Sequence, residues 1–228
     1  MDADETLERI SVALPAGPVE VSAAYGRPDA ASVTVAIAHG AGAGYAHPFY
    51  VGFARGLRAQ GFATLRFNFP HIETGRRMPG PPAHAVRTWA AVSEWTAARA
   101  PDDALWASGK SYGGRMASMA AAEGAIAPAG LIYLGYPLHP PGDPSKPRVA
   151  HLPDVAGPQL FIEGTRDPFI DPHEQLLEAV ASCQDATLEW IEDAAHSFEV
   201  KGRKRPADEI GADLAPLVAE FIRARSEA

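Results

Sequence analysis

Ser111 lies at the centre of a five-residue pattern, Gly109-Lys110-Ser111-Tyr112-Gly113, where a short apolar run meets a segment of helical periodicity. A serine on a sharp strand-to-helix turn exposes its hydroxyl, and glycines two residues to either side relieve the crowding around it. The positive end of the following helix also faces any anion that forms beside that serine. The pattern therefore predicts that Ser111 is a nucleophile.

The residues Gly109-Lys110-Ser111 are also the tail of the phosphate-binding pattern G-x-x-x-x-G-K-[ST]. That pattern requires a glycine at position 104, where the chain has Ala104, and four residues that form a phosphate cradle. Those four residues instead continue an apolar run, so the phosphate-binding interpretation is the weaker of the two.

A serine hydroxyl needs a general base to become a nucleophile. In the order expected for such a turn, the acid and then the base follow the serine, which leaves the candidates His139, His151, His173 and His196. His196 follows the last predicted strand, and loops at the carboxyl ends of parallel strands are where such a sheet holds its site. We predict that His196 is the base.

The acid that orients the base is expected between Ser111 and His196, at the end of another strand. Asp167 lies four residues beyond an apolar run that ends near Glu163, and a proline follows it. Asp171 and Glu163 are the alternatives. We predict that Asp167 holds the imidazole in the correct tautomer.

Two backbone N–H groups must bind the negative oxygen that forms during acyl transfer. The first is expected from Tyr112, the residue after the nucleophile. The second is expected from the Gly- and Ala-rich segment 39–44, which follows the first central strand. We assign it to Ala41, with Gly42 as the alternative donor.

Four further side chains lie in loops that are expected at the same end of the sheet. Arg76 and Arg77 follow a predicted strand and are candidates to bind an acidic group of the substrate, although solvated loop charges explain them equally simply. His47 and His71 are candidates to line the pocket.

These residues lie at the ends of predicted strands that alternate with predicted helices along the chain. Such alternation is typical of a parallel α/β sheet. The predicted strands are 10–14, 19–25, 33–38, 63–69, 104–107, 131–134, 159–163 and 187–191. The predicted helices are 49–60, 86–99, 111–123, 172–182 and 207–224. We expect one domain over residues 1–228, with a mostly parallel sheet of about eight strands, helices on both faces and an N-terminal hairpin at one edge. The Pro-rich stretch 139–158 is too short for a cap domain, so we expect an open pocket, walled by segments 45–50, 71–82 and 139–147, that prefers short, soluble esters.

These motifs resemble those of the α/β-hydrolase superfamily and follow one another in the same order. The resemblance extends from about residue 33 to the end of the chain. The stretches 39–43, 65–70 and 109–115 are similar to a small lidless branch that includes dienelactone hydrolase-like proteins and the testis-expressed and KANSL-type hydrolase-like proteins. Ser111 stands where dienelactone hydrolases use cysteine. The resemblance implies a serine hydrolase, carboxylesterase-like, without naming its substrate.

The composition of the chain excludes several classes of function and partner. The formal net charge of −8 argues against nucleic-acid binding, because an acidic protein repels the phosphate backbone. The only dense basic segment is 201–205, which we interpret as a solvated loop. The single cysteine, Cys183, excludes an internal disulfide, and no apolar run approaches the length of a membrane span. With an acidic N-terminal segment where a signal peptide would be basic, we expect a soluble, cytoplasmic protein. No metal or organic cofactor is expected, the partner is a small ester-type molecule, and the oligomeric state stays open. The alternative function is a non-catalytic interaction scaffold on the same fold.

Overall fold

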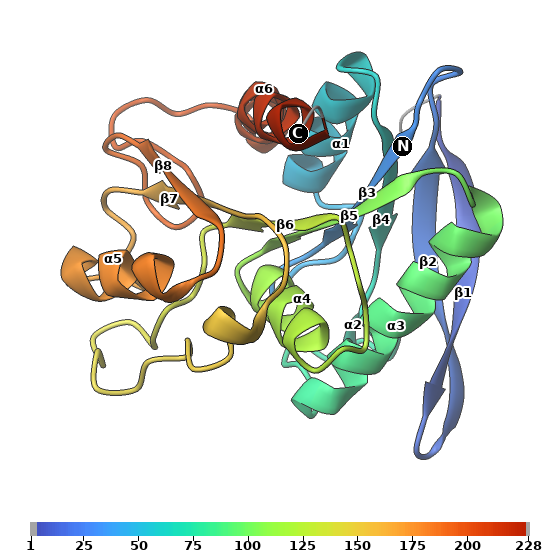
Figure 1. Cartoon of the computed structure of the whole chain (residues 1–228), viewed down its shortest axis with the longest axis horizontal. Coiled ribbons are helices and arrows are strands. Elements are labelled where there is room, and N and C mark those ends of the chain that lie inside the picture. The colour runs from blue at the N-terminus through green and yellow to red at the C-terminus, as the bar shows by residue number, and fades with distance from the viewer. Residues whose placement is uncertain (1–3, 227–228) are drawn as a thin grey trace.

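The computed structural model describes residues 4–226, and its centre is one eight-stranded sheet in the order β1-β2-β4-β3-β5-β6-β7-β8 (Figure 1). The strands are β1 (Thr6–Leu14), β2 (Gly17–Gly26), β3 (Val33–Ala38), β4 (Ala63–Phe67), β5 (Ala104–Lys110), β6 (Gly130–Leu134), β7 (Gln159–Gly164) and β8 (Ala186–Ile191). Strands β3 to β8 run parallel, whereas β1 and β2 form an antiparallel hairpin at the edge. The predicted fold class is confirmed.

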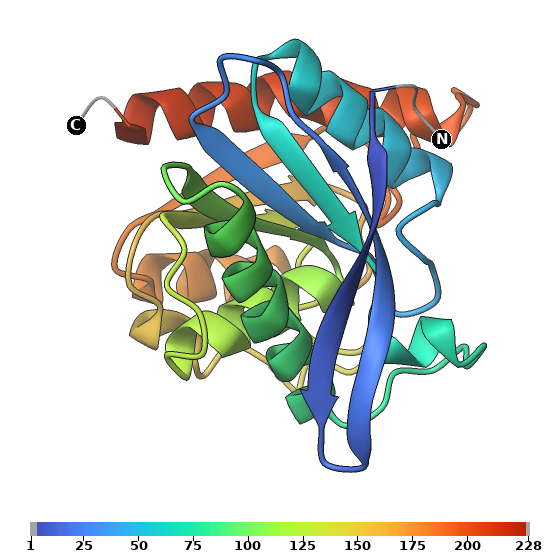
Figure 2. The ribbon, with the colours of Figure 1, turned by 90° about the vertical axis from the view of Figure 1, so that its right-hand side faces the viewer.

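Helices cover both faces of this sheet (Figures 1 and 2). One face carries α1 (Pro48–Ala59) and α6 (Ala207–Ser226), and the other carries α3 (Pro82–Arg99), α4 (Tyr112–Ala122) and α5 (His173–Ser182). Two short helices, α2 (Pro70–Glu73) and the single 3₁₀ turn η1 (Leu152–Asp154), lie in connections between strands. Within the described residues, no helix is long and apolar enough to cross a membrane.

The centre of the sheet is apolar on both faces, as the sequence of β3 predicts. All six residues of that strand are buried, because a parallel strand between two helical layers has no solvent face. The helices α1 and α6 pack at very short range through two glycines. A Cβ atom at Gly52 would lie 1.8 Å from the carbonyl oxygen of Asp208, and one at Gly211 would lie 2.0 Å from that of Phe49.

The observed elements differ from the predicted ones mainly at their ends. β4 stops at Phe67, because Pro70 begins the short helix α2, which the apolar pattern does not reveal. α3 begins four residues earlier than predicted, with Pro82 in its first turn, a position that proline favours. Segment 139–158 forms a loop with only the turn η1 in it, so it provides no cap over the site.

Candidate active site

Ser111 lies on the turn between β5 and α4, and its backbone is in an unfavourable conformation. Its φ of 50° and ψ of −115° are rare for a residue with a side chain, and such strain persists only where the surroundings enforce it. The Ser111 amide donates to the carbonyl oxygen of Leu134 at 3.1 Å, and its own carbonyl oxygen accepts from the Arg115 amide, the first bond of α4. The turn therefore holds the serine at the carboxyl end of β5.

The two glycines of the turn are required for a reason other than the predicted one. A Cβ atom at Gly109 would lie 2.2 Å from the amide nitrogen of Gly114, and one at Gly113 would lie 2.6 Å from the carbonyl oxygen of His39. The glycines thus allow α4 to lie close to β5 and to the end of β3, instead of relieving crowding around the serine side chain itself.

Asp167 and His196 are brought together from 29 residues apart. The Nδ1 atom of His196 lies 2.5 Å from Oδ2 of Asp167, whose other oxygen accepts from the Phe169 amide at 2.8 Å. Asp167 is only 2% exposed, and the ring of Phe169 lies against the imidazole with 4.2 Å between centroids. The alternative acid Asp171 is exposed on the surface.

The imidazole of His196 is a weaker base than a solvated histidine. Burial lowers its pKa below the usual value, the hydrogen bond that it donates to Asp167 raises the pKa in part, and the positive charge of Lys110 lowers it. Because Nδ1–H of His196 donates to Asp167, the Nε2 atom of the imidazole is left free to accept a proton from a neighbouring hydroxyl. His196 and Ser111 both flank the carboxyl end of β6, through contacts at Gly135 and Leu134 respectively.

The segment after β3 is held by three buried side chains. His39 accepts from the Phe69 amide at Nε2, so its Nδ1 carries the proton and donates to the carbonyl oxygen of Gly40 at 2.7 Å. Burial lowers the pKa of His39 to about 4, which keeps the ring neutral. The Gly40 amide donates to the hydroxyl of Tyr50 at 2.9 Å, and Nε2 of His71 lies 2.9 Å from the carbonyl oxygen of Ala41.

These bonds fix the direction of two peptide groups. Since the carbonyl oxygens of Gly40 and Ala41 are both engaged, the amides of Ala41 and Gly42 point the opposite way. Neither amide has a hydrogen-bond partner within residues 4–226. A Cβ atom at Gly40 would lie 3.9 Å from Cβ of Ser111, so this segment lies next to the strained serine.

The sequence model of the alpha/beta hydrolase domain matches residues 31–223, which is most of the chain. The chain belongs to the alpha/beta hydrolase family. Solved structures agree with this fold. A dienelactone hydrolase from Anabaena variabilis is 24% identical with a TM-score of 0.75, over 97% of this chain and 98% of that one. A member of the a/b serine hydrolases without a lid, from Xanthomonas campestris, is 24% identical with a TM-score of 0.70, over 98% and 96%. An alpha-beta serine hydrolase homologue from Coxiella burnetii is 21% identical with a TM-score of 0.72, over 97% and 98%.

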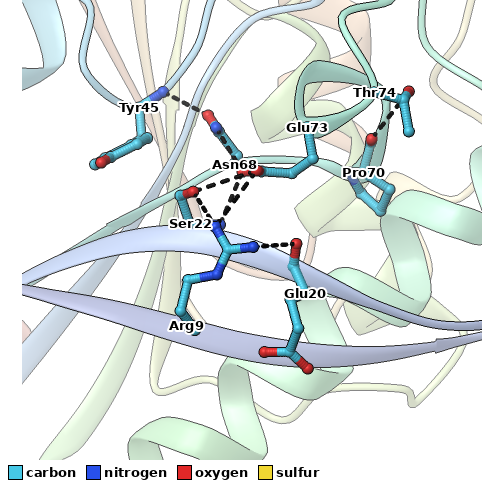
Figure 3. Close-up of polar contacts among 8 residues, drawn as sticks. All are labelled: Arg9, Glu20, Ser22, Tyr45, Asn68, Pro70, Glu73 and Thr74. Carbon is cyan, nitrogen blue, oxygen red and sulfur yellow. Dashed lines mark hydrogen bonds and ion pairs between the residues drawn. The ribbon is translucent and has the colours of Figure 1, made fainter.

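In this hydrolase, a network of polar contacts holds Tyr45, at the end of the segment that follows β3 (Figure 3). Oδ1 of Asn68 accepts from the Tyr45 amide at 2.8 Å, and its Nδ2 donates to Glu73 at 2.8 Å. Glu73 in turn accepts from the amide of Ser22 on β2 and pairs with Arg9 at 3.6 Å. The network ties the segment to α2 and to the N-terminal hairpin. Sequence patterns do not reveal it, because its members come from four separate segments.

The hydrolase also buries two ionisable side chains beside Asp167 and His196: Lys110, to which the motif gave no role, and Glu163, an alternative acid that does not contact His196. Lys110 donates from Nζ to the carbonyl oxygen of His196, and Glu163 accepts from the Tyr136 amide at 2.6 Å. Burial lowers the pKa of Lys110 to about 8 and raises that of Glu163 well above its usual range. In the sequence, the only sign of these two buried groups is that each is an ionisable residue within an otherwise apolar strand.

A cavity of about 270 Å³ opens next to Tyr112. Phe69, His71 and Tyr112 form one wall, and Arg76 and His84 contribute charged or polar groups to another. Further lining residues come from the hairpin (Leu14, Ala16 and Val19), from the segment between α2 and α3, and from the start of α3. Of the three segments expected to wall the pocket, 71–82 contributes to this cavity, whereas 45–50 and 139–147 do not line it. The β1–β2 hairpin can line this cavity because its ribbon extends past the rest of the sheet (Figure 2).

Of the four predicted substrate-binding residues, two line this cavity and two do not. His71 and Arg76 are among its lining residues. His47 is exposed and caps α1, accepting from the Phe49 amide at 3.3 Å, whereas Arg77 is exposed in the loop after α2. Over residues 4–226, no group of three or more His, Cys, Asp or Glu side chains is arranged to hold a metal ion.

Proposed function

We propose that this hydrolase is a serine esterase that cleaves a small ester or related acyl substrate through Ser111, His196 and Asp167. The observation that carries the proposal is the 2.5 Å contact between His196 and the buried Asp167, at the same edge of the sheet as the strained turn of Ser111. An acid, a base and a nucleophile in this relation are what acyl transfer to a hydroxyl needs.

The reaction proceeds in two steps, acylation of Ser111 and hydrolysis of the acyl-enzyme. Nε2 of His196 takes the proton of the Ser111 hydroxyl as Oγ attacks the acyl carbon, and the imidazolium then protonates the departing alcohol oxygen. The acyl group stays on Ser111 as an ester. Water next loses a proton to His196 and attacks the same carbon, and the proton returns to Ser111 as the carboxylic acid leaves. Asp167 stabilises the imidazolium in both steps.

The negative oxygen of each tetrahedral intermediate is bound by backbone N–H groups in this proposal. Tyr112 supplies one from the first turn of α4, where the helix dipole adds partial positive charge. Ala41 supplies the other, with Gly42 as the alternative, since both amides are unpaired and fixed in direction. The proposed steps use no metal and no organic cofactor.

The cavity beside Tyr112 is proposed as the site of the substrate's recognition group. Its volume of about 270 Å³ suits a small molecule, near the lower end of ligand pockets. Arg76 there favours an acidic group and His71 lines the same cavity, while His47 and Arg77 are proposed as outer contacts. The names of two similar structures, a dienelactone hydrolase and Est1E from Butyrivibrio proteoclasticus with ferulic acid bound, fit a small ester-type substrate. We also propose a cytoplasmic location, because Cys183 has no second cysteine to pair with.

A chain-length series of p-nitrophenyl esters, from acetate to palmitate, tests this proposal. We expect kcat/KM to be highest for the short esters, because an uncapped pocket buries few methylene groups at roughly 0.8 kcal/mol each. The Ser111→Ala variant is the control for each ester. No hydrolysis above that control for any ester would favour the non-catalytic scaffold, and a steady rise of kcat/KM beyond octanoate would contradict the small substrate.

A further inference from the structure

Lys110 ends a row of β5 side chains that faces α1 and α6. Trp106 begins this row and packs against Phe221 of α6. The neighbouring strand positions on the same face, Leu134 of β6 and Ile162 of β7, belong to the same apolar core. An ammonium group in such a place destabilises the folded state unless other groups compensate its charge. The contacts of Lys110 show what it does there.

The ammonium group of Lys110 is bonded to the backbone that carries the proposed base. Its Nζ donates to the carbonyl oxygen of His196 and lies 4.9 Å from the ring centre of Phe198, in the same loop. Gly135, with a φ of 69°, makes this approach possible. A Cβ atom there would lie 3.2 Å from Nζ of Lys110 and 3.3 Å from Nδ1 of His196. The ammonium and the imidazole therefore meet at the end of β6.

The charges around the ammonium come from β7 and the loop after it. Oε2 of Glu163 has no hydrogen-bond partner among the described residues, and burial raises the pKa of this carboxyl. Asp167, and to a smaller extent Glu163, act on the ammonium of Lys110 in the direction that favours its charge. Burial lowers the pKa of Lys110 to about 8, so the ammonium is still protonated at neutral pH. From α1, the apolar ring of Phe49 faces it, with 6.0 Å between Nζ and the ring centroid.

We propose that Lys110 is a positioning residue for His196, which fixes the loop that carries the imidazole and opposes protonation of the ring through its charge. The inference rests on the proposed function, in which His196 takes the proton of Ser111. An imidazolium between Asp167 and a fixed ammonium gives up its proton more readily to the leaving oxygen. Lys110 itself neither gives nor takes a proton in the reaction.

Two variants separate the charge of Lys110 from its bulk. Lys110→Met removes the charge and keeps the length, whereas Lys110→Arg keeps the charge. In the Met variant we expect the acidic midpoint of the kcat/KM profile to move up by about half a pH unit or more, and kcat to fall while KM is retained. In the Arg variant the midpoint should stay at the wild-type pH. A Met variant with the wild-type midpoint would overturn the inference.

A measurement on the wild-type protein covers the case in which the variants do not fold. The ¹H–¹⁵N spectrum of the lysine ammonium groups should show one slowly exchanging signal, moved upfield by the Phe198 ring and lost as the pH rises through about 8. A spectrum without a protected ammonium signal at neutral pH would overturn the inference. Ser111→Ala distinguishes the two proposals: if it still hydrolyses esters, the proposed function fails. If it is inactive while Lys110→Met keeps the wild-type midpoint, only the role of Lys110 fails.

Discussion

The imidazole of His71 lies 2.9 Å from the carbonyl oxygen of Ala41, thirty residues earlier in the chain. This contact helps to join α2 to the segment after β3 and fixes the direction of the peptide group between Ala41 and Gly42. The proposed binding site for the negative oxygen thus depends on a side chain that also lines the cavity beside Tyr112.

Replacing His71 by leucine should lower kcat more than it raises KM. The leucine leaves the cavity wall apolar but releases the Ala41 carbonyl, so the N–H donors lose their fixed direction. We expect a roughly tenfold loss of kcat, equivalent to ~1.4 kcal/mol of the barrier. The matched control is His84→Leu, which changes the same cavity without touching the segment after β3. Equal kcat values in the two variants would contradict this role of His71.

The choice between the two candidate acids is tested by paired substitutions. Asp167→Asn should lower kcat/KM by roughly a hundredfold to ten-thousandfold, because an amide no longer holds the Nδ1–H tautomer of His196 or stabilises its imidazolium. Asp171→Asn, four residues later and exposed, should retain most of the wild-type value. The assignment fails if the Asp171 variant loses the larger share of activity in the p-nitrophenyl acetate assay.

The pH dependence of kcat/KM follows from the environment of His196. Burial and the charge of Lys110 lower the pKa of its imidazole, and the base is active only when it is neutral. Activity should therefore rise with pH through a midpoint below about 6.5, the usual value for histidine, and remain high at neutral pH. A midpoint above that value, measured with a substrate that does not titrate in the range, would contradict the account.

Stability should depend on Gly109 much more than on Gly42. A methyl group at Gly109 would meet the amide nitrogen of Gly114 at 2.2 Å, so α4 would have to shift away from β5. We expect Gly109→Ala to lower the free energy of unfolding by roughly 1–3 kcal/mol. A methyl group at Gly42 meets nothing within 4 Å, so Gly42→Ala should unfold at the wild-type denaturant concentration. Urea unfolding followed by circular dichroism measures both variants, and equal midpoints would refute the steric argument.

The order of motifs along the chain was sufficient to predict that Asp167 and His196 meet. Each lies just beyond a strand, and the carboxyl ends of parallel strands share one edge of the sheet. The eight strands could be predicted for the same reason, since their apolar runs are separated by clear helical periods. The helix α2 was missed because it spans only four residues, too few to show a period.

The supporting contacts around the site could not be predicted from local patterns. Asn68 and Tyr45 are 23 residues apart, and Lys110 and His196 are 86 apart, so neither pair leaves a signature in the sequence. Lys110 occupies a variable position of its motif, which says nothing about the partner of its ammonium group. The extension of the hairpin toward the cavity likewise depends on the twist of the β1–β2 ribbon, which the apolar pattern does not determine.

The most direct test of a nucleophilic Ser111 is covalent labelling by a fluorophosphonate. Intact-mass measurement of the treated protein should show the addition of one label, and peptide mapping should locate it on Ser111. Ser111→Ala, with an unchanged circular dichroism spectrum, should take up no label and lose at least about a thousandfold in ester hydrolysis. A wild-type protein that stays unlabelled, or a Ser111→Ala variant that is still labelled and active, would contradict the central claim.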